Sequence, residues 1–393
     1  MSDDNVLIVG ANFRNKGAAA MAQTAVDKLE EPDVVISSIF DEDLESGDQY
    51  NVIKHVRLLE LFLKEILHIV TGGILRPNQL FSRWQQKRDE LGTYLKYVHQ
   101  ADVVVDLSGY ALTDKFGTLR IWSWVEVVFL SRLLGKPFVM LPQSVGPLKK
   151  FRKRLLVRVA LPFGDSLSVR GSVSERWLKK AGVQDFAVYP DTAFLFEPAP
   201  VARANEILTE AGLSNQFVTI VPNARLYERW EDYESELAAI ADTVLEQGYE
   251  VLLLPHEYTD DGNIDDQYVI AQIRQREEFD NAVIIEQELS ARELKAVVGE
   301  SDLLIGSRLH STVAGVSTNV PTIAIGWSEK YYEILEWVDS EDDVWIPSNY
   351  DRGSVIERIE EICTQGHQGY SNLREVKRKA KKSYDSVRMR LDK

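Results

Sequence analysis

Short runs of β-branched and other apolar residues alternate with amphipathic stretches along almost the whole chain. The apolar runs predict buried strands, because a strand of a parallel sheet covered by helices on both faces has no polar side. These runs lie at 6–10, 34–40, 103–107, 138–141, 166–169, 186–189, 217–221, 251–255, 282–286, 303–306 and 322–325. Helical periodicity marks the stretches between them, such as 18–29, 236–247 and 291–298. The alternation predicts an α/β fold with parallel sheets.

A proline-rich break, Glu197-Pro198-Ala199-Pro200, interrupts this alternation near the middle of the chain. Its two prolines disfavour a regular element and stiffen a connector. We therefore predict two Rossmann-like domains, at 1–197 and 201–393, the second ending in helices. Two such domains would face a cleft at the carboxyl ends of their strands, where sheets of this kind bind ligands.

The charge of the chain is unevenly distributed. The 393 residues carry 45 Lys+Arg and 61 Asp+Glu, a formal net charge of −16. This excess excludes a non-specific nucleic-acid binder, which needs positive charge against phosphates. Residues 1–200 carry 25 basic and 24 acidic side chains, whereas residues 201–393 carry 20 and 37. The less acidic first domain is therefore predicted to receive an anionic or lipid-linked acceptor.

Cysteine content and the N-terminal sequence bear on the compartment. The lone Cys363 excludes an internal disulfide framework and a cysteine-based metal cluster. The N-terminus starts Met1-Ser2-Asp3-Asp4, without the basic start and long apolar core of a secretory signal. We expect a cytoplasmic protein with no metal site and no cofactor.

A loop with glycine at both ends, residues 10–17, joins the first predicted strand to an alanine-rich helix. Glycine permits a tight turn and close approach of a ligand, and a helix N-terminus offers N–H groups to an anion. The spacing is not that of a dinucleotide fingerprint. Asn12, Asn15 and Gly17 are predicted ligand contacts, and the alternative is a plain strand-to-helix connector.

Polar residues end the next two strands of the first half. Asp106 and Gly109 follow one strand, and Gln143 and Ser144 follow the next. A carboxylate at this edge of the sheet can accept a hydrogen bond from a sugar hydroxyl or act as a general base. The alternative is that these residues cap helices and form turns, as Asp and Ser often do.

The sharpest motif is Gly306-Ser307-Arg308-Leu309-His310-Ser311, where an apolar strand gives way to a helix. Arginine is a forked, permanently charged donor suited to carboxylate or phosphate, and histidine moves protons near neutral pH. The helix N-terminus adds partial positive charge. The motif predicts an anion site with Arg308 and His310 as catalytic groups. Ser311 and Lys330 are predicted to contact the same substrate.

Three lesser features complete the candidates. His256 and Asp191 each follow a predicted strand and are predicted substrate contacts, with caps as the alternative; a zinc site at His256 lacks a second ligand. A basic run at 149–158 interleaves with apolar residues and predicts peripheral contact with an anionic membrane surface, or else a solvated helix face. Its basic members are Lys149, Lys150, Arg152, Lys153, Arg154 and Arg158.

The order of these motifs resembles the polysaccharide pyruvyl transferase family. The resemblance rests on the pieces at 12–17, 106–109, 143–147, 170–174, 190–194 and 306–310. It implies two GT-B-like Rossmann domains and transfer of a pyruvyl group from phosphoenolpyruvate to sugar hydroxyls, often as a cyclic ketal, in exopolysaccharide or cell-surface polysaccharide biosynthesis. It also adds Arg170 to the predicted substrate contacts.

The chemistry of this donor suits the predicted anion site, because phosphoenolpyruvate carries one carboxylate and one phosphate. His310 is the candidate to protonate the donor's methylene carbon or to stabilise phosphate, and Asp106 is the candidate base for the acceptor hydroxyl. One alternative is a GT-B glycosyltransferase that uses a nucleotide-sugar. Another is an inactive carbohydrate-binding relative, since Ala18 and Gly171 stand where acidic residues are common in the family.

Overall fold

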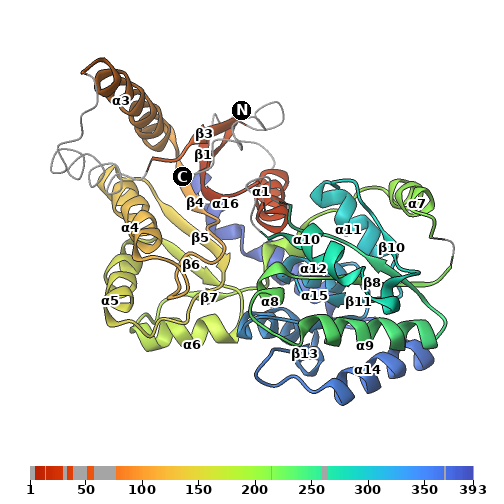
Figure 1. Ribbon diagram of the computed structural model, residues 1–393. Coiled ribbons are helices and arrows are strands. Elements are labelled where there is room, and N and C mark those ends of the chain that lie inside the picture. The colour runs from red at the N-terminus through yellow and green to blue at the C-terminus, as the bar shows by residue number, and fades with distance from the viewer. Residues whose placement is uncertain are drawn as a thin grey trace. The chain divides into compact units, whose positions relative to one another are not determined.

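The chain forms two compact units, each built on one parallel sheet (Figure 1). A computed structural model describes residues 5–13, 15–29, 33–38, 51–56, 77–213, 215–258, 264–366 and 369–392. The first unit takes its described residues from Met1–Phe13, Ala25–Tyr189 and Lys381–Lys393, and the second from Arg14–Thr24 and Pro190–Ala380. The predicted division at 197 and 201 uses two continuous pieces, whereas each compact unit also includes a short segment distant in sequence.

The first unit contains a seven-stranded sheet in the order β3-β2-β1-β4-β5-β6-β7, with every neighbouring pair parallel. Its strands are β1 Asn5–Ala11, β2 Asp33–Ser38, β3 Asn51–Lys54, β4 Val103–Asp106, β5 Phe138–Gln143, β6 Ser166–Val169 and β7 Ala187–Val188. Its helices are α3 Pro77–Gln100, α4 Thr118–Leu133, α5 Phe151–Ala160, α6 Ser172–Ala181 and α16 Asp385–Leu391.

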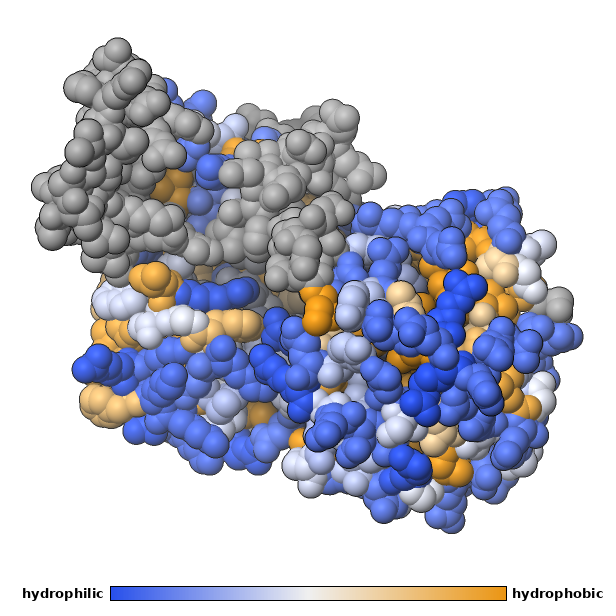
Figure 2. Space-filling view, viewed as in Figure 1, coloured by the Kyte–Doolittle hydropathy of each residue, from blue (hydrophilic) through white to orange (hydrophobic). Residues whose placement is uncertain are grey.

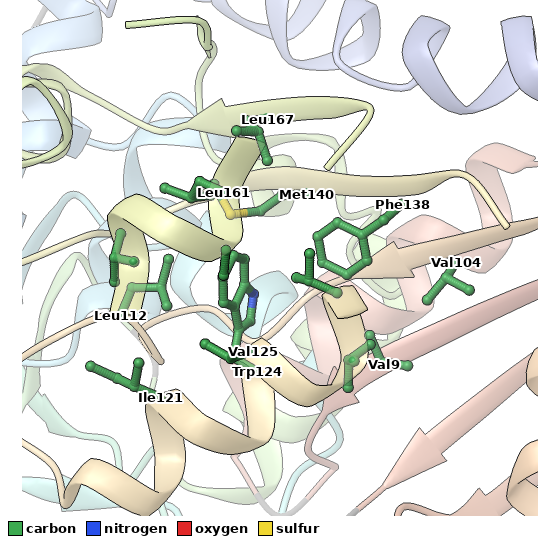
Figure 3. Close-up of a cluster of buried hydrophobic side chains, with 14 of the residues drawn as sticks. Val9, Val104, Leu112, Ile121, Trp124, Val125, Phe138, Met140, Leu161 and Leu167 are labelled. Atoms are coloured by element: carbon green, nitrogen blue, oxygen red, sulfur yellow. The ribbon is translucent and has the colours of Figure 1, made fainter. Parts of the chain in front are cut away.

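The core of the first unit forms where α4 packs on the central strands. Trp124 of α4 lies among Val9 of β1 and Phe138 and Met140 of β5 (Figure 3). The rings of Trp124 and Phe138 meet edge to face, with centroids 5.8 Å apart. Burial of such aromatic side chains is a large part of what holds a helix to a sheet, because each removes a wide apolar area from water.

The second unit contains a six-stranded parallel sheet in the order β10-β9-β8-β11-β12-β13. Its strands are β8 Phe217–Val221, β9 Glu250–Leu253, β10 Val283–Ile284, β11 Leu303–Gly306, β12 Thr322–Ile325 and β13 Val344–Trp345. The helices are α7 Val201–Glu210, α8 Ala224–Tyr227, α9 Tyr233–Glu246, α10 Asp266–Ile273, α11 Ala291–Gly299, α12 Leu309–Ser317, α13 Tyr332–Leu335 and α14 Arg352–Gln365. Two more, α1 Lys16–Leu29 and α15 Leu373–Lys382, begin in this unit.

Both faces of the second sheet are covered by helices, as its continuous apolar strands require. Val218 and Ile220 of β8 belong to a core with α9, α10 and α14. Phe217 and Val221 of the same strand belong to another core with α7, α11 and α12. Alternate residues of one strand therefore fill two different cores, which is the period of two that a strand imposes.

The predicted fold class, α/β with two Rossmann-like sheets, is confirmed. The strand expected at 34–40 is β2, whose last two expected residues, 39 and 40, lie outside the described residues. Strands β3 and β13 were not predicted. Each is an edge strand of at most four residues. Asn51 and Lys54 flank the two apolar residues of β3, and β13 directly follows the acidic residues 341–343, so neither strand gives a clear apolar run.

Candidate functional site

Each sheet has a point where the strand order changes direction, and ligands of such sheets bind at the carboxyl ends of the strands there. In the first unit this point lies between β1 and β4, which pair from Val6 to Val9. In the second unit it lies between β8 and β11. The candidate residues fall into two clusters, one at each of these edges.

The first-unit cluster surrounds a small cavity of about 60 Å³ at the ends of β1 and β4. Predicted residues Asn12 and Asp106 line it, together with Ser108, Trp124 and His55, which were not predicted. Gly10 allows this arrangement, because its φ is +79° and a Cβ there would lie 2.3 Å from the Ser108 hydroxyl oxygen. The cavity combines polar groups with an apolar wall, as small-molecule sites generally do.

Asp106 is fully buried and accepts hydrogen bonds on both carboxylate oxygens. Its Oδ1 accepts from the backbone N–H of Ser108 at 3.0 Å and from the Ser108 hydroxyl at 2.5 Å. Its Oδ2 accepts from Trp124 Nε1 at 2.6 Å and from Gln143 Nε2 at 2.8 Å. Burial raises the pKa of Asp106, although these four hydrogen bonds act in the opposite direction. Ser108 is the less buried of the Asp106–Ser108 pair and reaches the cavity.

Four other predicted residues of the first unit do not line this cavity. Gln143 also donates to the carbonyl of Asp106 at 3.0 Å, so it holds the end of β4. Ser144 donates its N–H to the carbonyl of Gly109 at 3.0 Å, and its hydroxyl accepts from Arg170 Nε at 2.6 Å. Arg170 is almost completely buried. These four residues support the strand ends.

His55 lines the cavity, although the sequence did not predict it as a site residue. Its Nδ1 lies 3.1 Å from the Ser37 hydroxyl and its Nε2 lies 3.4 Å from that of Ser123, while its ring meets Tyr94 edge to face. The signal was weak because His55 directly follows β3, the short strand that the sequence pattern did not reveal.

The second-unit cluster centres on Arg308, the N-cap of α12. Its Nε donates to both oxygens of Asp266, at 3.1 and 3.0 Å. Its Nη2 bonds Asp266 again, and its Nη1 pairs with Glu257. Burial alone would lower the pKa of Arg308, but the carboxylates of Asp266 and Glu257 raise it. Arg308 is therefore charged and held in place by two acids, and the Glu257 side chain is the more exposed of them, at 31% against 0%.

Asp266, at the start of α10, ties three strand-end loops together. Its Oδ1 accepts from the N–H of Ala224, after β8, at 3.3 Å. Its Oδ2 accepts from the N–H groups of His256 and Glu257, after β9, at 3.2 and 2.9 Å. Through Arg308 it also holds the loop after β11. Sequence reasoning missed Asp266 because it follows a polar, acidic loop typical of solvated surface.

His310 packs against Gly17, so two motifs nearly 300 residues apart in the sequence meet. A Cβ on Gly17 would lie 1.9 Å from His310 Nδ1, which leaves room for no side chain but glycine's hydrogen. His256 and Lys16 line the same small space, of about 20 Å³. Lys16 pairs with Glu288 and lies 5.6 Å from the centre of the Tyr258 ring.

The environment of His256 makes it neutral. Burial lowers the pKa of His256 to about 3, and the Coulombic effects of His310, Arg308 and Lys16 act in the same direction. A neutral imidazole beside His310 adds no charge of its own near neutral pH. His256 therefore joins the cluster as a neutral group.

The remaining predicted residues have local roles in the structure. Asn15 Oδ1 accepts from the N–H groups of Gly17 and Ala18, both at 3.1 Å, and so caps α1. Asp191 Oδ1 accepts from the N–H of Ala193 at 2.9 Å as the cap of a short 3-10 turn. Ser311 donates to the carbonyl of Arg308 at 2.7 Å. The alternative of helix and turn capping thus describes the contacts of Asn15 and Asp191.

Lys330 belongs to a neighbouring group at the same sheet edge. Its ammonium lies 4.3 Å from the ring of Trp327, which follows β12, and the guanidinium of Arg225, after β8, lies 5.2 Å from the same ring. Arg225 and Trp327 were not predicted. Among the described residues, no group of three or more His, Cys, Asp or Glu side chains is arranged to hold a metal ion.

The family model for polysaccharide pyruvyl transferase matches residues 15–329, which include Gly17, His256, Asp266 and the Arg308–His310 motif. The chain belongs to this family. The family is one of transferases.

The chain is also similar to the amylovoran biosynthesis protein AmsJ of Erwinia amylovora. It is 25% identical over 305 residues, which cover 74% of this chain and 71% of AmsJ. The role in amylovoran biosynthesis is that of AmsJ.

Solved structures resemble the chain in fold. The UDP-GlcNAc 2-epimerase of Methanocaldococcus jannaschii has a TM-score of 0.59 at 10% identity, over 98% of this chain and 99% of that one. HepE of Anabaena, in complex with UDP, has a TM-score of 0.57 at 12% identity, over 99% and 98%. At such identities the likeness shows the fold alone.

Proposed function

We propose that this chain transfers a pyruvyl group from phosphoenolpyruvate to hydroxyls of a sugar or glycan acceptor, forming a ketal and releasing phosphate. Family membership supports a transferase. The observation that carries the proposal is the packing of His310 on Gly17 at the start of α12, beside Arg308. His310, which is proposed to transfer a proton, lies close to the charged Arg308 at this strand-to-helix junction, and this proximity supports the proposal.

The donor would bind at the start of α12. The side chain of its N-cap residue, Arg308, makes no capping hydrogen bond to this helix, and the N–H groups of a helix's first turn favour an anion. Asp266 holds Arg308 through Nε and Nη2, while the more exposed Glu257 occupies Nη1. A carboxylate or phosphate of the donor would take the place of Glu257, and Asp266 would keep the guanidinium in position.

The reaction follows from the chemistry of an enol phosphate. The methylene carbon of the donor takes a proton from His310, and the carbon that bears the phosphate becomes electron-poor. An acceptor hydroxyl oxygen bonds to this carbon and gives up its proton. A second hydroxyl oxygen then forms the other bond of the ketal, while the carbon–oxygen bond to phosphate breaks and phosphate leaves with the electron pair. One hydroxyl proton restores His310, and the other is taken up by a base and then leaves with phosphate.

The acceptor is proposed to bind in the first-unit cavity, with its proton removed through Ser108. Asp106 is too buried to meet a sugar directly, but its Oδ1 accepts the Ser108 hydroxyl proton at 2.5 Å. The acceptor hydroxyl would pass its proton to Ser108 Oγ as the Ser108 proton moves to Asp106. Trp124 and Gln143 hold the other oxygen of the carboxylate, which fixes Asp106 for this task.

Replacing Ser108 by Ala tests this role, because the variant keeps the backbone hydrogen bond to Asp106 and loses only the hydroxyl. We expect kcat to fall by roughly 100-fold or more, the usual contribution of general base catalysis, with KM for phosphoenolpyruvate unchanged. Ser131→Ala in α4 is the control, since that hydroxyl donates only to the carbonyl of Val127. A Ser108→Ala enzyme with wild-type kcat would remove Ser108 from the mechanism.

The donor assignment is tested by calorimetry with phosphoenolpyruvate and with a panel of nucleotide-sugars. The proposal expects phosphoenolpyruvate to bind and the nucleotide-sugars not to. His310→Gln should abolish pyruvyl transfer while leaving the melting temperature near that of the wild type. Binding of a nucleotide-sugar alone, or full activity in His310→Gln, would contradict the proposal.

The place of this reaction in the cell is also part of the proposal. The relation to AmsJ supports a role in exopolysaccharide biosynthesis. Among the described residues, no helix has the length and apolar content needed to cross a bilayer. The predicted cytoplasmic location and peripheral membrane contact remain proposals, and the membrane contact rests on the exposed faces of α4 and α5.

A further inference from the structure

Exposed apolar side chains gather on two neighbouring helices of the first unit, α4 and α5. Figure 2 shows orange and pale orange atoms among blue ones over this part of the molecule. Leu133 is 81% exposed and Phe151 is 67% exposed. The α4/α5 surface, as we define it, consists of Leu119, Trp122, Phe129, Leu133, Phe151, Leu155, Val159 and Phe163. The other large apolar side chains exposed in the described part of the chain are few and scattered.

The face of α5 that points outward is the apolar one. Phe151, Leu155 and Val159 are exposed at a spacing of four, which places them in one stripe along the helix. Val157 lies on the opposite, buried side. Lys153 was predicted as part of the basic run, but it also points inward and donates to the carbonyls of Phe116 at 2.5 Å and Thr113 at 3.2 Å.

Basic side chains border this stripe on α5. By helical spacing, Arg152 lies on one side of it and Arg158 and Arg154 on the other. Residues 117–164 contain nine Lys and Arg but one acid, Glu126, which is half-buried on α4. The total charge of the chain is −16, so this concentration of positive charge is local to the segment.

Helices α4 and α5 pack against each other, so their outward side chains form one surface. The rings of Phe129 in α4 and Phe163, just after α5, lie with centroids 4.9 Å apart. Exposed apolar patches with polar rims mark interaction sites, because leaving such area in water is unfavourable. The occupant of this surface must therefore be apolar where it meets the stripe and negative around it.

We infer that the α4/α5 surface docks on an anionic lipid bilayer. The apolar stripe would enter the boundary between headgroups and acyl chains, while the arginine side chains beside it extend to the lipid phosphates. A second copy of this chain fits poorly, because two copies meeting through this surface would bring like charges together. The inference concerns the first unit alone and does not depend on the proposed reaction.

Vesicle co-sedimentation of the full chain tests the inference, with phosphatidylcholine vesicles that contain or lack phosphatidylglycerol. The wild type should sediment with the anionic vesicles, and added salt should weaken the binding. Arg152→Gln with Arg158→Gln should weaken it by roughly 30-fold, from about 1 kcal/mol for each basic residue at a membrane surface. Phe151→Ser with Val159→Ser should weaken it as well.

Matched controls remove the same chemistry elsewhere. Lys381→Gln with Lys382→Gln removes two exposed positive charges, and Val201→Ser removes an exposed apolar side chain of α7. Both controls should bind as the wild type does, and every variant should keep its melting temperature. Equal binding by wild type and α4/α5 variants, or binding that ignores phosphatidylglycerol, would overturn the inference. So would a wild-type dimer in solution that Phe151→Ser with Val159→Ser dissociates.

Discussion

At the scale of single residues, Gly17 shows how closely the loop before α1 and the start of α12 pack together. A methyl group there would overlap the ring of His310, with Cβ 1.9 Å from Nδ1. Gly17→Ala must therefore displace either His310 or the first turn of α1. We expect pyruvyl transfer to fall by at least 100-fold, because misplaced catalytic groups lose that much.

The control for this substitution is Gly92→Ala on α3, where a Cβ would meet nothing within 4 Å. Alanine there should keep full activity and add about 0.5–1 kcal/mol to the free energy of unfolding, since glycine weakens a helix interior by that amount. An active Gly17→Ala enzyme would show that His310 needs no fixed position.

His256 predicts how stability depends on pH. Its pKa is about 3 in the folded chain, compared with about 6.5 for an unperturbed histidine. The folded state therefore favours the neutral ring, and this contribution to stability is present above about pH 6.5 and is lost as the pH falls toward 3.

Chemical denaturation of the wild type and of His256→Gln measures this effect. Between about pH 7 and about pH 5 the wild type should lose about 2 kcal/mol more stability than His256→Gln. His99→Gln, at an exposed position on α3, should follow the wild type. Parallel curves for wild type and His256→Gln would show that folding does not lower the pKa of His256.

At the scale of elements, one carboxylate joins the loops after β8, β9 and β11. Asp266 accepts from three backbone N–H groups and from Arg308. Asp266→Asn would remove one of the two acidic partners of Arg308 and leave only Glu257. Removing one partner of a buried ion pair costs about 3–5 kcal/mol, and we expect a loss of that size in the free energy of unfolding.

Asp265→Asn is the neighbouring control. Asp265 caps α10 by accepting from the N–H of Tyr268 at 2.9 Å, and asparagine caps a helix about as well. Denaturation should therefore find this variant within about 0.5 kcal/mol of the wild type. If both variants lose equally little, Asp266 does not organise these loops.

Sequence patterns predicted the inner strands of both sheets, because buried strands have no polar side, and they also predicted the edge strands β7 and β10. They missed β3 and β13, which are short edge strands. They also brought forward Gly17, Asp106, Arg308 and His310, since each stands where a strand meets a loop or helix. The sequence pattern revealed candidate site residues only where they stand close to such a junction.

The sequence could not predict which residues distant along the chain contact each other in the folded protein. The pairing of Arg308 with Asp266 and Glu257 depends on three strand ends that meet only in the folded sheet. The same holds for His310 against Gly17 and for Ser108 against Gly10. Helix-capping residues such as Asn15 and Asp191 look like ligand contacts in sequence, because capping and ligand binding use the same polar side chains.

At the scale of the whole molecule, the two units differ in charge. Residues 201–393, most of which belong to the second unit, carry 37 acidic and 20 basic side chains. Arg225, Arg308 and Lys330 stand after β8, β11 and β12 of this unit. The first unit is more basic and presents its charge beside the exposed faces of α4 and α5. The α4/α5 surface and the candidate acceptor cavity belong to the same unit, which would suit an acceptor presented at a membrane.

The central claim is pyruvyl transfer from phosphoenolpyruvate, and mass spectrometry of glycan acceptors incubated with the enzyme and this donor tests it most directly. The account predicts a product heavier than the acceptor by one pyruvate less one water, with one phosphate released for each pyruvyl group. The product should be absent with His310→Gln and present with Ser131→Ala. An unchanged acceptor mass with the wild type across sugar, nucleotide-linked and lipid-linked acceptors, or the same product from His310→Gln, would contradict the account.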